Sequence, residues 1–153
     1  MQILQGNQQY VDGCLSIAKD LRQYFNESGI KTMREDLTKH LLYIALENKE
    51  VHGFLTLVQK NEKVFEISWM AVKLGQQHQG VGSALIEFVF EELKAQGVKL
   101  LEVKTLAEDV EYQPYEITRA FYRKMGFIHV ETINPYPDWG PGNPCAIFVK
   151  ILA

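Results

Sequence analysis

A short glycine-bearing stretch, residues 77–83, has the residue types and spacing best suited to holding a phosphate group on its backbone; it reads Gln77, His78, Gln79, Gly80, Val81, Gly82, Ser83. Apolar residues then recur at helical spacing from Val81 to Leu93, so the stretch opens a predicted helix. The first turn of a helix has unpaired N–H groups and a partial positive charge, which favour a bound anion. Gly80 and Gly82 lack Cβ atoms where the backbone would approach that anion. We call residues 77–83 the glycine loop.

Two common nucleotide-binding motifs do not match the glycine loop. A P-loop requires GxxxxGK[ST], and Val81 stands where the lysine belongs. A dinucleotide fingerprint requires GxGxxG, and Leu85 stands at the third glycine. An ordinary turn before a helix remains the simplest alternative to an anion site.

The elements that must position this loop form an alternating pattern. Predicted strands cover residues 2–5, 41–46, 51–58, 64–72, 100–106, 127–133 and 146–152. Predicted helices cover residues 12–25, 30–40, about fifteen residues from Val81, and 117–125. On the strand 64–72, the period of two predicts that Glu66, Ser68 and Met70 share a face. The order predicts an α/β fold with a mixed, mostly antiparallel central sheet of about six to seven strands flanked by about four helices.

Composition limits the class of protein. The 153 residues predict a single domain, 1–153, and the formal net charge of −3 favours neither nucleic acid nor an anionic membrane as a partner. Two cysteines without CxxC spacing and scattered histidines predict no metal site. The sequence has no signal peptide pattern and no apolar run long enough to span a bilayer, so we expect a cytoplasmic protein.

Two motifs together resemble those of one enzyme superfamily. The pattern Gln77-x-x-Gly80-x-Gly82, placed after Met70-Ala71-Val72, is similar to motif A of the GNAT acetyltransferases. The run from Phe121 through Phe127 is similar to their second signature, FYxxxGF. The proline-rich tail before the last strand also resembles small bacterial members. The resemblance implies a GNAT-type fold, with the CoA pyrophosphate on the glycine loop and the pantetheine arm along Met70, Ala71 and Val72.

The same resemblance suggests roles in aminolysis of a thioester. Tyr122 is the candidate acid for the departing thiolate, with a core tyrosine as the alternative. Glu66 has the spacing of the glutamate base in histone acetyltransferases, and the alternative is a carboxylate that only pairs with the substrate's positive charge. The backbone N–H of Met70 would stabilise the oxyanion. Acceptor recognition would come from irregular segments that contain Tyr112, Tyr115, Tyr136, Asp138 and Trp139.

These inferences predict an N-acetyltransferase that moves the acetyl group of acetyl-CoA to a primary amine of a small molecule or peptide. No cysteine is placed to carry an acyl group, so we expect direct attack in a ternary complex, without a metal. Two alternatives remain open: a non-catalytic acyl-CoA-binding regulatory module, and an acyltransferase for another acyl chain or acceptor. Both a monomer and a homodimer are compatible with the sequence.

Overall fold

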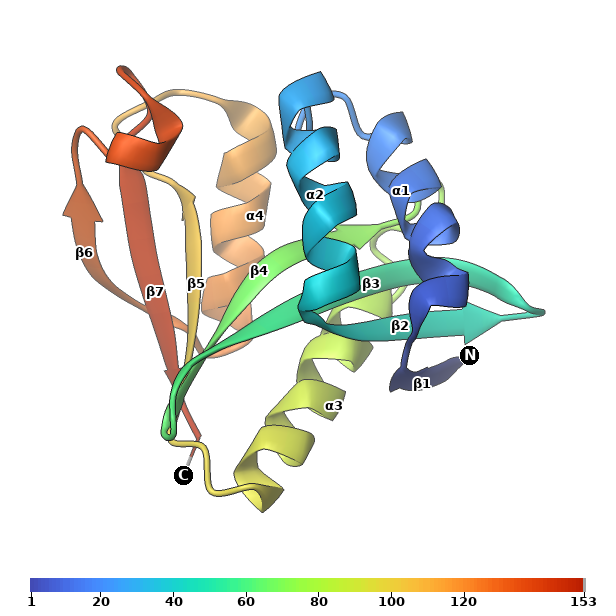
Figure 1. Cartoon of the computed structure of the whole chain (residues 1–153). Coiled ribbons are helices and arrows are strands. Elements are labelled where there is room, and N and C mark those ends of the chain that lie inside the picture. The colour runs from blue at the N-terminus through green and yellow to red at the C-terminus, as the bar shows by residue number, and fades with distance from the viewer. Residues whose placement is uncertain (153) are drawn as a thin grey trace.

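The seven predicted strands join one sheet with helices on both faces in the computed structural model, which describes residues 1–152 (Figure 1). Ala153, the last residue of the predicted domain, lies outside the described residues. The strands are β1 Gln2–Gln5, β2 Leu41–Glu47, β3 Glu50–Asn61, β4 Val64–Val72, β5 Leu100–Leu106, β6 Ile128–Ile133 and β7 Cys145–Ile151. The helices are α1 Val11–Asp20, α2 Glu27–Lys39, α3 Val81–Ala95 and α4 Gln113–Lys124, with 3-10 turns η1 Gln8–Tyr10 and η2 Pro137–Trp139. The predicted fold class is confirmed.

The sheet has the strand order β1-β2-β3-β4-β5-β7-β6. All neighbouring strands are antiparallel except β4 and β5, which run parallel and pair only from Val64–Leu100 to Ile67–Val103. Beyond Ile67 the strand β4 remains paired with β3, and β5 remains paired with β7. The sheet therefore opens between β4 and β5, and Met70, Ala71 and Val72 lie along one side of the opening.

Each face of the sheet packs against its own helices (Figure 1). On one face, α1 and α2 cover a cluster that includes Ile44 and Phe54. On the other face, α3 and α4 cover a cluster that includes Leu55 and Leu101. The two clusters are separated by the sheet, so a side chain's cluster identifies the face that it occupies.

A β-bulge in β4 changes which side chains reach which face. Thr56 of β3 pairs with Trp69 and Leu57 pairs with Ile67, so Ser68 has no partner in this register. Before the bulge, Ile67 packs with α3 and α4, whereas after it Trp69 packs with α1 and α2 and Met70 with α3 and α4. The prediction that Ser68 and Met70 share a face is therefore wrong, because an extra residue shifts the alternation by one.

Three helix boundaries differ from the sequence prediction by three residues or more. Helix α1 ends at Asp20 rather than at residue 25, and Asn26 begins the next helix instead of ending the first one. The Asn26 side chain accepts a hydrogen bond from the Gly29 N–H at 2.7 Å, a common N-cap that starts α2 at Glu27. Helix α4 begins at Gln113, four residues before the predicted start, because proline is favourable in a first helical turn.

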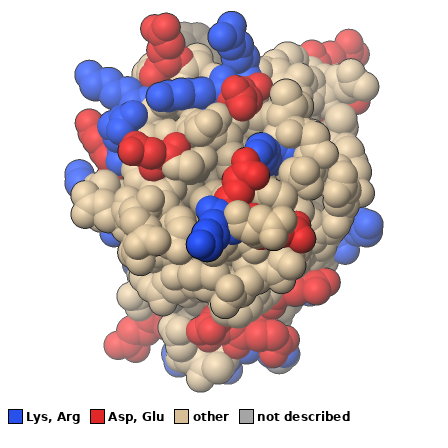
Figure 2. All heavy atoms as spheres, turned by 90° about the vertical axis from the view of Figure 1, so that its right-hand side faces the viewer, with Lys and Arg blue, Asp and Glu red and all other residues tan. Residues whose placement is uncertain are grey.

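The surface presents charges of both signs. Figure 2 shows lysine, arginine, aspartate and glutamate side chains interspersed over one face of the molecule. Within residues 1–152, no helix combines the length and apolar character needed to cross a bilayer.

Candidate active site

The glycine loop presents a row of backbone N–H groups at the start of α3. Gly80 is the N-cap of this helix and has φ of 86°, a left-handed conformation that favours glycine. Hydrogen bonds from the Gln76 N–H to the Lys73 carbonyl and from the Ala84 N–H to the Gly80 carbonyl bracket the loop. Between them, the N–H groups of residues 77–83 have no acceptor among residues 1–152. Unpaired donors at the positive end of a fifteen-residue helix are an arrangement that favours a bound anion.

The two loop glutamines stabilise the loop itself. The Gln77 side chain donates to the carbonyl of Val72 at 3.3 Å, and the Gln79 side chain donates to the carbonyl of Gly75 at 3.3 Å. His78 has φ of 62°. The side chains of Gln77 and Gln79 therefore stabilise the conformation of the loop, and its backbone N–H groups remain available to a ligand.

Gly82 serves packing as well as the loop. A Cβ atom at this position would lie 3.3 Å from Cζ of Phe121 and 3.4 Å from Cε of Met70. Sequence reasoning explained Gly82 by close approach of a ligand, but the structure shows that its missing side chain lets α3 start against α4 and β4. At Gly80, in contrast, an added Cβ would meet no atom within 4 Å, so its φ alone explains the glycine.

The opening between β4 and β5 contains an unsatisfied polar atom. Thr105 of β5 is 3% exposed, and its Oγ1 has no hydrogen-bond partner among the described residues. It lies on the same strand face as Leu101 and Val103, level with the part of β4 that has diverged. The diverging strand edges and this buried hydroxyl group are therefore polar groups without a partner strand or side chain at this place.

Tyr122 lies at the same opening, on α4. Its side chain is 5% exposed, and its hydroxyl group points to Sδ of Met70 at 3.7 Å. Burial raises the pKa of the Tyr122 phenol above its ordinary value of 10.0, and Tyr115 raises it further. The phenol therefore keeps its proton near neutral pH and has a proton to donate at this site.

Glu66 lies on β4 in a cluster of charges. Its Oε2 accepts from Nζ of Lys104 at 2.9 Å, and Lys104 lies 3.6 Å from Glu102. Burial alone would lower the pKa of Lys104, but the hydrogen bond and charge of Glu66 raise it, together with Tyr136 and Glu102. Lys104 is therefore charged, and its ammonium group donates to the Glu66 carboxylate. No sequence pattern indicated this partner, because the two residues lie on different strands.

The aromatic residues singled out in the sequence divide into two groups. Tyr112 donates to the carbonyl of Gln23 at 2.6 Å and Tyr24 donates to the carbonyl of Pro114 at 2.9 Å, which ties the α1–α2 loop to the start of α4. Tyr115 packs edge-on against Tyr24. Tyr136 packs against Trp139 at η2, on the opposite side of the sheet opening, and faces Lys104.

Sequence reasoning missed two polar groups near this opening. His40, Ser68 and Thr56 form a hydrogen-bonded chain on the α2 face of β4. Arg119 of α4 is 3% exposed and donates to the carbonyl of Leu106, which fixes α4 against β5. In the sequence, an arginine in an amphipathic helix is expected on the polar, exposed face. The burial of Arg119 is therefore visible only in the structure. Among the described residues, no group of three histidine, cysteine, aspartate or glutamate side chains is arranged to bind a metal ion.

An anion site at a helix start, beside a sheet that opens next to a buried phenol, is the arrangement of an acyltransferase that uses a long, phosphate-bearing acyl donor. The comparison with protein families supports this class, because residues 38–129 match the model of the acetyltransferase (GNAT) domain. This match covers more than half of the chain. The protein therefore belongs to the GNAT acetyltransferase family, as its two motifs predicted.

Solved structures share the whole fold. A GNAT-family acetyltransferase structure from Desulfovibrio desulfuricans has a TM-score of 0.88 at 19% identity over 99% of each chain. The ribosomal-protein-S18-alanine N-acetyltransferase from Escherichia coli has a TM-score of 0.79 at 21% identity, covering 99% of this chain and 94% of its own. A GNAT acetyltransferase from Elizabethkingia anophelis with acetyl-CoA bound has a TM-score of 0.74 at 22% identity, covering 98% of this chain and 97% of its own. The comparison with curated proteins found no match.

Proposed function

We propose that the protein transfers the acetyl group of acetyl-CoA to a primary amine by direct attack in a ternary complex. The observation that carries this proposal is the row of unpaired N–H groups in the glycine loop, next to the opening between β4 and β5. A diphosphate on the loop leaves an extended arm free to enter the opening. The Elizabethkingia neighbour, whose structure contains acetyl-CoA, supports this choice of donor.

The residues available for acetyl-CoA form a continuous path. The backbone of residues 77–83 would hold the pyrophosphate by hydrogen bonds and the helix dipole. The free edge of β4 at Met70, Ala71 and Val72 would pair with the amides of the pantetheine arm, and the Thr105 hydroxyl offers a further partner. The arm would then end beside Tyr122, which contacts Met70.

Three groups would act on the reacting atoms. The Met70 N–H would stabilise the negative charge that develops on the carbonyl oxygen. The Tyr122 phenol would donate to the sulfur as the C–S bond breaks, and its raised pKa keeps the proton available until thiolate charge appears. Glu66 was predicted as a base or as a ligand of the substrate's positive charge. Its 2.9 Å pair with Lys104 favours the second role, because protonating Glu66 would break a charge-assisted hydrogen bond.

The acceptor we propose is a small-molecule or peptide amine. Aromatic side chains of the α1–α2 loop and η2, with the carboxylates of Glu66 and Asp36, suit a cationic group. The Escherichia coli neighbour is named for an alanine of a ribosomal protein as its acceptor, which is consistent with a peptide amine.

Thiol release with a panel of amines tests this function. We expect CoA to be released from acetyl-CoA only when an amine is present, with a matching gain of one acetyl group in the amine by mass spectrometry. Tight acetyl-CoA binding without thiol release for any amine would favour the regulatory-module alternative. Faster release from a longer acyl-CoA would favour the alternative of another acyl chain.

A further inference from the structure

A chain of polar side chains joins α2 to the bulge of β4. The His40 Nδ1 lies 2.8 Å from the Ser68 Oγ, and the Ser68 Oγ lies 2.7 Å from the Thr56 Oγ1. On the other side of the ring, the His40 Nε2 lies 3.6 Å from the Asp36 Oδ1. The second oxygen of Asp36 accepts from the Trp69 indole at 2.8 Å, which holds the carboxylate in place. His40 is therefore fixed between a carboxylate and a hydroxyl group.

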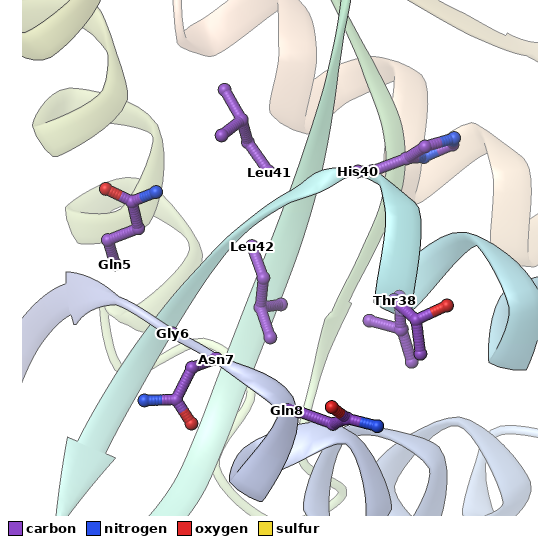
Figure 3. Close-up of a pocket in the computed structure, with 9 residues that line it drawn as sticks. Gln5, Gly6, Asn7, Gln8, Thr38, His40, Leu41 and Leu42 are labelled. Atoms are coloured by element: carbon purple, nitrogen blue, oxygen red, sulfur yellow. The ribbon is translucent and has the colours of Figure 1, made fainter.

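This ring is turned toward Ser68 of β4 rather than toward the nearest hollow. A shallow hollow of about 150 Å³ lies between the segment 5–8 and the end of α2, and His40 is among its lining residues. Figure 3 shows the His40 ring pointing away from Gln5 and Asn7, which lie on the other side of that hollow. The contact of its ring is with Ser68 of β4.

The bulge places Ser68 beside the reaction centre that we propose. Ser68 follows Ile67, the last residue of β4 that pairs with β5, and precedes Met70 by two residues, about 7 Å along a strand. Its hydroxyl group reaches α2, whereas Tyr122 contacts Met70 from α4 on the other face of the sheet. A thioester held at Met70 would thus have an acid on one face and the Ser68–His40 pair on the other.

The carboxylate of Asp36 suggests the direction in which a proton would move. With a proton on Nε2 facing Asp36 at 3.6 Å, Nδ1 of His40 would accept the Ser68 hydroxyl proton. Ser68 would then accept from Thr56, which is fully buried, and keep one lone pair free. That lone pair can accept a proton from an ammonium group while the Ser68 proton passes to His40.

We propose that Ser68 takes the proton from the acceptor's ammonium group and that His40 acts through Ser68 as the proton store. This inference rests on the proposed N-acetyl transfer. The amine nitrogen forms a bond to the carbonyl carbon and the C–S bond breaks. Of the two protons that the nitrogen loses, one passes through Ser68 and His40 to solvent and the other replaces the proton that Tyr122 gives to sulfur. His40 can return its proton to water because its side chain is 20% exposed.

The groups facing His40 are few. Asp36 comes from its own helix, and β4 and β3 contribute the hydroxyls of Ser68 and Thr56. The β1–η1 segment that shares the hollow contributes Gln5, Gly6, Asn7 and Gln8, none of which ionises. Glu66, two residues before Ser68, is paired with Lys104. The carboxylate of Asp36 is therefore the charge that would stabilise a protonated ring.

The pH dependence of kcat/KM for the amine tests this role. Only the neutral imidazole ring accepts a proton, so a role of His40 predicts that wild-type kcat/KM rises with pH and then levels off. In His40→Gln and Ser68→Ala, we expect a loss of about 100-fold at pH 7, with rates that keep rising toward the pKa of the free amine. Ser68→Thr keeps the hydroxyl group and should retain most of the activity. His129→Gln on β6 is the matched histidine control.

Three outcomes decide the question. If the ratio of kcat/KM between His40→Gln and wild type is the same at all pH values, His40 has a structural role and the proposal is overturned. If the rise of kcat/KM with pH is lost in Glu66→Gln but kept in His40→Gln, Glu66 is the base instead. Acetyl-CoA binding measured by calorimetry should be unchanged in His40→Gln. A wild-type protein that binds acetyl-CoA and acetylates no amine would refute the proposed function itself, whatever the variants do.

Discussion

Alanine substitutions at two glycines with similar positive φ angles can test coenzyme binding and folding separately. Gly80 starts α3 with φ of 86° and Gly97 follows its end with φ of 80°, and an added Cβ would meet no atom within 4 Å at either position. Alanine at each site therefore adds no steric clash, and only the left-handed backbone is penalised, by about 1 kcal/mol.

The penalty should appear in different measurements for the two variants. At Gly97, the Val98 N–H donates to the Leu93 carbonyl and the Gly97 N–H to the Lys94 carbonyl, so the helix end cannot relax. We expect Gly97→Ala to lower the free energy of unfolding by about 1 kcal/mol. The backbone N–H groups of the glycine loop lack such acceptors, so we expect the loop to relax in Gly80→Ala and acetyl-CoA to restore its shape. A cost of about 1 kcal/mol corresponds to about a fivefold rise in Kd.

Isothermal titration calorimetry with acetyl-CoA and urea unfolding measure the two quantities on the same samples. Gly97→Ala should leave Kd unchanged, and Gly80→Ala should leave the unfolding free energy nearly unchanged. Equal Kd values for Gly80→Ala and wild type would refute the assignment of the glycine loop as the anion site. An equal loss of affinity in both variants would show that a general loosening of α3 is responsible.

Three further predictions concern the residues around the opening and the core. Tyr122→Phe should lower kcat for thiol release by about 100-fold while Kd for acetyl-CoA is kept, and unchanged kcat would remove Tyr122 from the chemistry. Arg119→Met should lower the unfolding free energy in urea by about 2 kcal/mol, because the Leu106 carbonyl loses a charged donor; an unchanged midpoint would contradict its anchoring role. Burial raises the pKa of Cys14 from 9.0 to about 12, so the thiol ionises first in the unfolded state. This contribution to the free energy of unfolding should be fully present well below pH 9 and fall as the pH rises to 12, by about 1.4 kcal/mol at pH 10, and the fall should be smaller in Cys14→Ala.

The order of elements and the glycine loop could be predicted because both depend on local patterns. Alternating apolar residues mark β4, and the spacing of Val81, Leu85 and Leu93 marks α3. Tyr24 and Phe25 continued the apolar pattern of α1, although they belong to a loop that packs on Tyr115 and Trp69. The spacing of apolar residues indicates which side chains are buried. A buried residue in a loop can therefore continue the pattern of the helix that precedes it.

The chemistry on the α2 face could not be predicted, because it depends on a bulge and on contacts between distant segments. A single extra residue at Ser68 sends its hydroxyl to His40, twenty-eight positions away, and nothing local in the sequence marks that extra residue. The pair of Glu66 with Lys104 likewise needs the parallel register of β4 and β5. The motif singled out Tyr122 as the candidate acid, whereas its contact with Met70 required the fold.

The short seam between β4 and β5 has a consequence for the lifetime of the protein. Within the sheet, the pairs from Val64–Leu100 to Ile67–Val103 are all that join the β1–β4 half to the half formed by β5, β7 and β6. A molecule whose amides bridge this gap supplies cross-links that the polypeptide lacks, and it stabilises the folded state by mass action. Melting temperature and amide exchange in β5 should then follow occupancy of the gap, so that the supply of such a molecule also governs resistance to proteolysis.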